Sequence, residues 1–128
     1  MGVHTRSVGV AFWAALLTGC TETQGQQPLV RIAELEIELA HLADYKAAVT
    51  EEIETSLRVE PGVLAIYSVA LKDSPNHLRF LEIYADDSAY ESHLQSDHFK
   101  KYVETTRNMI TSRRLLETVP VVLGSKAR

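Results

Sequence analysis

The chain has 128 residues, which is enough for one domain of ordinary size and too few for two. Hydrophobic residues make up 45% of the sequence and charged residues 23%, the balance of a globular protein rather than a disordered one. The formal net charge is −4. Contacts to phosphate groups require clustered Lys and Arg, so we do not expect nucleic acid as a partner.

Residues 1–19 are typical of a secretory signal peptide. Arg6 supplies a positive charge, and residues 8–17 form an apolar run that is too short to span a bilayer. The motif LTGC at residues 17–20 resembles the lipobox of bacterial lipoproteins, in which the cysteine is acylated and the chain is cut just before it. Cys20 is the only cysteine, so it cannot form a disulfide within the chain. The alternative is an ordinary secretory signal with a chance cysteine near the cleavage site.

Residues 20–28 are mostly polar and predict a flexible tether that follows an acylated Cys20. We expect the folded domain to occupy residues 29–123 and a short tail to occupy residues 124–128. Each buried methylene of an acyl chain contributes about 0.8 kcal/mol to membrane binding, so several chains would anchor the protein stably. The expected location is the cell envelope, on a bacterial membrane and outside the cytoplasm.

The first predicted elements are a strand at residues 29–38 and a helix at residues 42–59. The strand is apolar at both alternating sets of positions, which suggests cover on both faces. Pro61 and Gly62 end the helix. Its apolar residues recur at spacings of three and four and predict the buried stripe: Leu42, Tyr45, Val49, Ile53 and Leu57.

A hairpin follows, with strands predicted at residues 63–71 and 77–85 and a turn at residues 72–76. Asp86 and Asp87 are suited to the start of a short helix that ends near Gln95.

Ser96 or Asp97 then begins a second helical run. Its apolar face extends from Phe99 to Ile110, and a last strand is predicted at residues 114–123, with Pro120 placing its end at a sheet edge.

The order strand, helix, strand, strand, helix, strand predicts an α+β, ferredoxin-like βαββαβ fold with a four-stranded antiparallel sheet. Helices would cover one face of the sheet. We expect Leu81 and Ile83 to pack under the helices, which leaves Phe80, Glu82 and Tyr84 on the open face. An aromatic face in water favours a partner sheet, so we predict a homodimer.

Four motifs together resemble the antibiotic biosynthesis monooxygenase (ABM) domain over residues 29–122. They are EPGVL at residues 60–64, FLEIY at 80–84, AYESH at 89–93 and DHFK at 97–100. The resemblance implies a dimeric α/β barrel. It does not decide the activity, because the family includes cofactor-independent oxygenases of quinols and polycyclic phenols, haem-degrading enzymes, a signal-molecule isomerase and members of unknown role. Haem-degrading relatives use a Trp near position 84 and an Asn in the first strand, and this sequence has neither.

His93 occupies the place of a histidine in the family motif and is our first candidate for a catalytic residue. An imidazole titrates near pH 6.5 and can take a proton from a phenol at neutral pH. A structural histidine between helix and sheet is the alternative. Glu82 is the second candidate, since a carboxylate within an apolar strand is costly to bury unless it is paired. It could orient His93 or bind substrate hydroxyls, or it could pair with an arginine across the dimer interface, such as Arg31 or Arg114.

An aromatic set could hold a flat ligand, or it could form the core of a dimer. Its members are Tyr67, Phe80, Tyr84 and Phe99. His98 and His41 are interpreted as solvent-facing or helix-end residues. No metal site is predicted, because the helix restarts near Ser96 and the side chains of His93, Asp97 and His98 need not converge.

Three functions remain open at this point. The first is an envelope-anchored, cofactor-independent monooxygenase that acts on a quinol or similar electron-rich phenol. The second is a non-catalytic dimeric module that binds a small aromatic ligand, and the third is a structural dimer without a ligand. The sequence contains no flavin or nicotinamide fingerprint, so no cofactor is expected.

Overall fold

The computed structural model describes residues 26–126. The predicted signal peptide and Cys20 lie outside the described residues, as do residues 127 and 128. Within the described part of the chain, no helix has the length and apolar character needed to cross a membrane.

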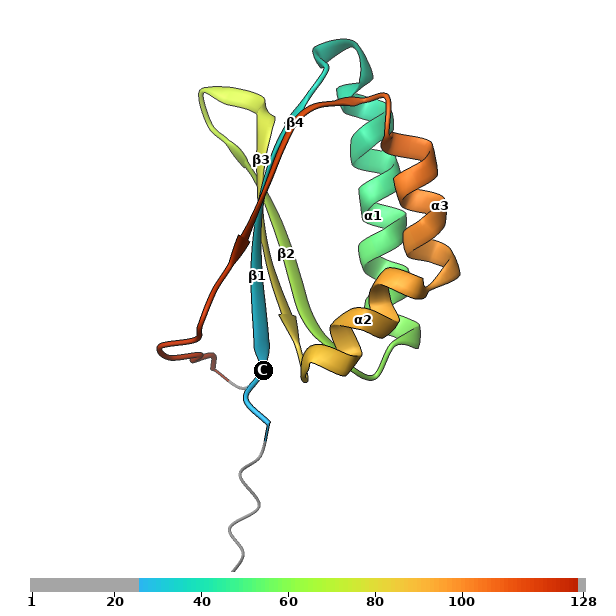
Figure 1. The fold of residues 1–128 in the computed structure, drawn as a ribbon. Coiled ribbons are helices and arrows are strands. Elements are labelled where there is room, and N and C mark those ends of the chain that lie inside the picture. The colour runs from blue at the N-terminus through green and yellow to red at the C-terminus, as the bar shows by residue number, and fades with distance from the viewer. Residues whose placement is uncertain (1–25, 127–128) are drawn as a thin grey trace, which may run out of the picture.

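The chain folds into one four-stranded sheet with its helices on a single side (Figure 1). The elements are β1 (Leu29–Ile37), the short 3₁₀ helix η1 (Leu39–His41), α1 (Leu42–Val59), β2 (Val63–Leu71), β3 (Ser74–Tyr84), α2 (Asp87–Gln95), α3 (Asp97–Thr106) and β4 (Ile110–Glu117). The strand order is β2-β3-β1-β4, and every neighbouring pair is antiparallel. The ferredoxin-like α+β prediction is confirmed.

Three elements differ from the prediction by more than one residue. Helix α3 ends at Thr106, so Ile110, which was predicted on its apolar face, instead begins β4. β3 begins at Ser74, so Pro75 lies inside the strand. Neither the β1 nor the β2 register gives Pro75 a partner, which is the situation in which a strand tolerates proline.

β4 covers Ile110–Glu117 rather than residues 114–123. In its register with β1, Val119 would lie opposite Leu29, where β1 begins, so the apolar residues beyond it have no strand to pair with.

Helix α1 has the predicted bounds but a different buried stripe. The buried residues are Tyr45, Val49, Glu52 and Ser56, at spacings of four, three and four. Leu57 was expected in the stripe but is 47% exposed. The helix therefore turns two polar side chains, from Glu52 and Ser56, toward the sheet.

The faces of the sheet are the reverse of the prediction. Phe80 is 5% exposed and Tyr84 is fully buried, whereas Leu81 is 38% exposed. In the register with β1, Phe80 lies opposite Ala33, which belongs to the core under the helices. Both sets of alternating positions in β3 are apolar, so alternation alone could not select the covered face. The Phe80 ring lies opposite the small Ala33.

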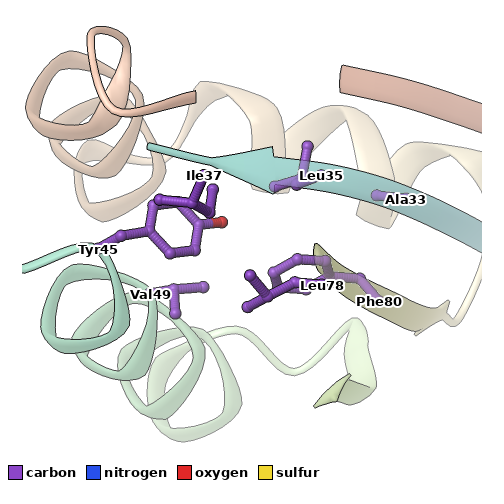
Figure 2. Packing of buried hydrophobic residues seen from close by; sticks show 7 residues of the cluster. All are labelled: Ala33, Leu35, Ile37, Tyr45, Val49, Leu78 and Phe80. Carbon is purple, nitrogen blue, oxygen red and sulfur yellow. The ribbon is translucent and has the colours of Figure 1, made fainter. Parts of the chain in front are cut away.

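The main core lies between α1 and the upper half of the sheet. Figure 2 shows Tyr45 and Val49 of α1 facing side chains of β1 and β3. The cluster consists of Ala33, Leu35, Ile37, Tyr45, Val49, Leu78 and Phe80. The Tyr45 hydroxyl lies 2.7 Å from that of Tyr102, a hydrogen bond that joins α1 to α3.

Two local contacts position α2 at the other end of the sheet. The Asp86 side chain accepts a hydrogen bond of 2.7 Å from the Ala89 amide, which caps the N-terminus of the helix. Gly62, in the turn before β2, lies so close to Ala89 that a Cβ at position 62 would be 2.5 Å from the Ala89 Cβ. A glycine is required here by the close approach of α2 to the turn.

Candidate functional site

A cavity of about 590 Å³ lies between the helices and the covered face of the sheet. All four strands and all three α-helices contribute to its wall. The predicted residues Phe80, Glu82, Tyr84, His93 and Phe99 all line it. Tyr67 does not, because its side chain is on the open face and 60% exposed. The predicted aromatic set is therefore divided between the two faces.

His93 is held by a carboxylate at the end of α1. It lies on α2 and is 3% exposed. Its Nδ1 atom is 2.8 Å from Oε2 of Glu60, and Nε2 of His98 is 2.8 Å from the same oxygen. Burial raises the pKa of Glu60, but hydrogen bonds from the two imidazoles outweigh it and hold that pKa below its usual range. Of the two alternatives for His98, the structure supports the helix end, because His98 is the second residue of α3 and its side chain is only 18% exposed.

Glu52 faces the other nitrogen of His93. Its Oε1 atom lies 3.6 Å from His93 Nε2 and accepts a hydrogen bond of 2.7 Å from the Ser56 hydroxyl. The carboxyl is buried, and this burial raises its pKa despite the Ser56 hydrogen bond and the nearby imidazoles. His93 thus lies between two carboxylates, Glu52 on the cavity side and Glu60 on the side of the turn.

Glu82 and Tyr84 form a second polar pair in the cavity wall. The Tyr84 hydroxyl donates a hydrogen bond of 2.9 Å to Oε2 of Glu82. Burial raises the pKa of both groups. Among the described residues of the single chain, Glu82 has no hydrogen bond to His93 and no ion pair with an arginine, and a pair across a dimer interface stays a prediction. Arg31 lies 3.9 Å from Glu117, and Arg114 lies 3.7 Å from Glu34.

Aromatic rings surround the His93 imidazole. The ring centroids of Phe99 and Tyr84 lie 4.7 and 5.4 Å from that of His93, both tilted. Tyr90 packs edge-on against Tyr84 at 5.1 Å. Such a wall offers flat apolar surface to an aromatic ligand beside groups that can exchange protons.

One group of side chains in the described residues has the composition of a metal site. Ligand atoms of Glu52, His93 and His98 all lie within 4.8 Å of one another, and imidazole with carboxylate is a donor set that divalent cations accept. In this structure Nε2 of His98 and Nδ1 of His93 contact Glu60. Asp97, which was considered beside His93 and His98 in the sequence, is not part of this group.

Glu52 and Glu60 are the site residues that sequence reasoning missed. Glu52 was not included in the predicted buried stripe of α1, which was drawn from apolar residues alone. Its position seven residues after Tyr45 and three after Val49 was the signal that places it on the buried stripe. Glu60 gave no such signal, since its role depends on a contact with a helix more than thirty residues later.

Comparison with known proteins agrees with this architecture. The profile of the family described as "Antibiotic biosynthesis monooxygenase" matches residues 28–105, which is more than half of the chain. The chain belongs to the antibiotic biosynthesis monooxygenase family. No protein of curated function matches the sequence.

Solved structures of ABM relatives show the same fold. A candidate antibiotic biosynthesis monooxygenase from Bacteriodes thetaiotaomicron VPI-5482 is 46% identical, with a TM-score of 0.75 over 79% of this chain and 96% of that one. A candidate monooxygenase from Lactobacillus acidophilus NCFM is 35% identical, with a TM-score of 0.68 over 70% of this chain and 44% of its own length. At 21% identity, a candidate ABM protein from Caulobacter crescentus CB15 supports the fold alone, with a TM-score of 0.67 over 75% of this chain and 93% of that chain.

Proposed function

We propose that this ABM protein is a monooxygenase that oxidises a quinol or a similar electron-rich phenol inside the cavity. The observation that carries the proposal is the meeting of Glu52, Glu82 and His93 in one aromatic-lined cavity of about 590 Å³. Small-molecule sites commonly have volumes of about 300–1,000 Å³. Burial raises the pKa of both carboxyls, and a base works best when its pKa is near the working pH.

The substrate supplies the electrons in this reaction. A base removes the proton of a phenolic hydroxyl, and the electron-rich phenolate reacts with dioxygen at a ring carbon that carries hydrogen. One oxygen atom forms a bond to that carbon, and the other leaves as water with two hydrogens of the substrate. The quinol becomes a hydroxyquinone, so atoms and electrons balance without a cofactor.

We assign separate tasks to the two polar groups of the wall. Glu60 accepts a hydrogen bond from Nδ1 of His93, which leaves Nε2 as the acceptor nitrogen, 3.6 Å from Oε1 of Glu52. This pair is placed to accept the proton of the phenol. Glu82 and Tyr84 lie on β3 and are placed to bind the second oxygen of the substrate.

The decisive experiment measures oxygen uptake by the purified protein with a panel of quinols, after chelation of metals. Labelled dioxygen should place one oxygen atom in the product. His93→Ala should reduce kcat by about 10²- to 10⁴-fold, the usual contribution of a general base. Glu82→Gln should raise KM, because Glu82 is assigned to bind the second oxygen of the substrate. Arg114→Gln changes the open face and should retain activity. Uptake no greater than autoxidation for every quinol would contradict the proposal. A quinol-dependent rise in melting temperature would then favour the binding-module alternative.

We also propose that the protein is lipid-anchored in the envelope through Cys20. The support is the apolar run of residues 8–17 followed by the lipobox-like motif. Metabolic labelling with a fatty acid should mark the wild type and leave Cys20→Ser unmarked. Equal labelling of the two proteins would rule the anchor out.

A further inference from the structure

The cavity has two chemically different ends. One end is formed by groups that are largely withdrawn from solvent, including Glu52, Tyr84 and His93. The other lies between α3 and β4, where the lining residues Val103 and Leu115 are 39% and 51% exposed. A ligand can therefore enter between α3 and β4, and we call this end the mouth.

Two arginines line the mouth. Arg107 is the C-terminal cap of α3 and forms an ion pair with Glu104 one turn earlier. Arg113 lies on β4 opposite Leu35, which places it on the same side of the sheet as the helices. Within residues 26–126, no ion pair includes Arg113. The mouth of this net acidic protein is thus positively charged.

We propose that the mouth binds an anionic substituent of the substrate, so that the substrate class is a hydroxylated aromatic acid. A guanidinium group presents several donors in one plane and binds a carboxylate through two hydrogen bonds. At the other end, Glu52 and Glu82 disfavour a second anion and accept phenolic hydroxyls. The two ends together admit the substrate in one orientation, with the hydroxyl inside and the acid group at the mouth.

The inference rests on the proposed function for its chemistry, but binding tests it separately. The probe is 2-naphthoate, an aromatic acid without a hydroxyl to oxidise, and the neutral comparison is 2-naphthamide. Calorimetry should show that Arg113→Gln raises the Kd of 2-naphthoate about tenfold and leaves that of 2-naphthamide unchanged. Arg107→Gln should have a smaller effect, because Glu104 already occupies its guanidinium. The naphthoate affinity of the wild type should fall with added salt.

Arg114→Gln is the matched control. Arg114 is the next residue of the same strand, but it contacts Glu34 on the open face. Its removal changes the net charge equally and should leave both affinities unchanged. Equal loss of naphthoate binding in the two variants would show that net charge alone accounts for the effect, and this would overturn the proposal. Absence of naphthoate binding at millimolar concentration would overturn it as well.

Turnover separates this inference from the proposed function. With a dihydroxynaphthoic acid as substrate, Arg113→Gln should raise KM and leave kcat nearly unchanged, because the arginine is distant from the reacting hydroxyl. Selective naphthoate binding without oxygen uptake would contradict the proposed function and leave the mouth site standing. Oxygen uptake with equal KM for acidic and neutral quinols would contradict the mouth site and leave the proposed function standing.

Discussion

The two faces of the sheet balance charge in different ways. On the open face, Glu34 lies between Arg79 at 3.4 Å and Arg114 at 3.7 Å, so opposite charges meet beside solvent. On the covered face, Glu82 has a tyrosine hydroxyl as its hydrogen-bond partner, and Glu52 has a serine hydroxyl and a nearby imidazole. Burial raises the pKa of both of these carboxyls. The two carboxyls that line the cavity and have a raised pKa therefore lie on the covered side of the sheet.

The largest difference between the faces should appear in Phe80→Ala and Leu81→Ala, neighbours in β3 that point in opposite directions. Phe80 is 5% exposed in the core, so its truncation should lower the free energy of unfolding by about 3–5 kcal/mol. Leu81 is 38% exposed and should cost about 1 kcal/mol or less in the monomer. Urea denaturation at two protein concentrations measures both. Equal costs at low concentration would show that the faces do not differ in this way.

The second prediction concerns assembly through the open face, which we propose as the interface of a homodimer. Besides Leu81, the apolar side chains on this face include Ile32, Tyr67, Val69, Ile83 and Leu116. Leu81→Glu would bury an unpaired charge there and should weaken the dimer at least 10²-fold, as measured by sedimentation. The sequence-based assignment had placed Phe80 on the open face and would have made Phe80→Glu the test. Because Phe80 lies in the core, that substitution would instead disrupt the fold. A wild-type protein that sediments as a monomer at micromolar concentration would contradict the proposal.

The third prediction compares Glu60 with Glu34, each of which contacts two basic side chains. Glu60→Gln removes the acceptor of two imidazoles beside the cavity and should cost about 1.5–3 kcal/mol near neutral pH. Glu34→Gln, on the open face, should cost about 1 kcal/mol or less. The pKa of Glu60 is lowered on folding, so its contribution is present above the unfolded value of about 4.5 and is lost as pH falls through the folded value. Thermal melts from pH 3 to 8 should therefore show that the melting temperatures of the two glutamine variants converge at acid pH.

The smallest expected effect is a gain in stability rather than a loss. Burial raises the pKa of Glu82, so its protonated form stabilises the fold below the unfolded value of about 4.5, and this contribution is lost as pH rises through the folded value. Glu82→Gln removes this loss and keeps an acceptor for Tyr84. It should be more stable than the wild type at pH 8, and this advantage should shrink as pH falls toward the unfolded value. A wild-type advantage that grows with pH would show that Glu82 is stabilised as an anion.

Local signals in the sequence were enough for most of the fold. Pro61 and Gly62 predicted the last residue of α1 correctly. Ser96, one of the two residues expected to cap the next helix, is the N-cap of α3. The last strand was misplaced because apolar character drew it toward Val121 and Val122, whereas pairing is limited by where β1 begins. Strand ends depend on a partner, and a partner far away in the sequence leaves no local trace.

The site was less accessible to sequence reasoning for a similar reason. His93 and Glu82 attracted attention by residue type, and both line the cavity. The partners of His93 could not be named, because Glu60 meets it only when the turn after α1 packs beside α2. Tyr67 shared residue type with Tyr84, yet the strand register placed them on opposite faces.

Gly62 shows how a residue without functional groups can control a reactive one. A methyl group at position 62 would lie 2.5 Å from the Ala89 Cβ, well inside the roughly 3.5–4.0 Å at which carbon atoms attract each other. Relief requires α2 to move outward, and His93 is carried on α2 while Glu60 stays with the turn. The size of one hydrogen atom therefore sets the separation of an imidazole and a carboxylate. In the turn that contains Gly62, the volume of a substituted side chain should therefore decide whether it is tolerated, even though the neighbouring contact is one between polar groups.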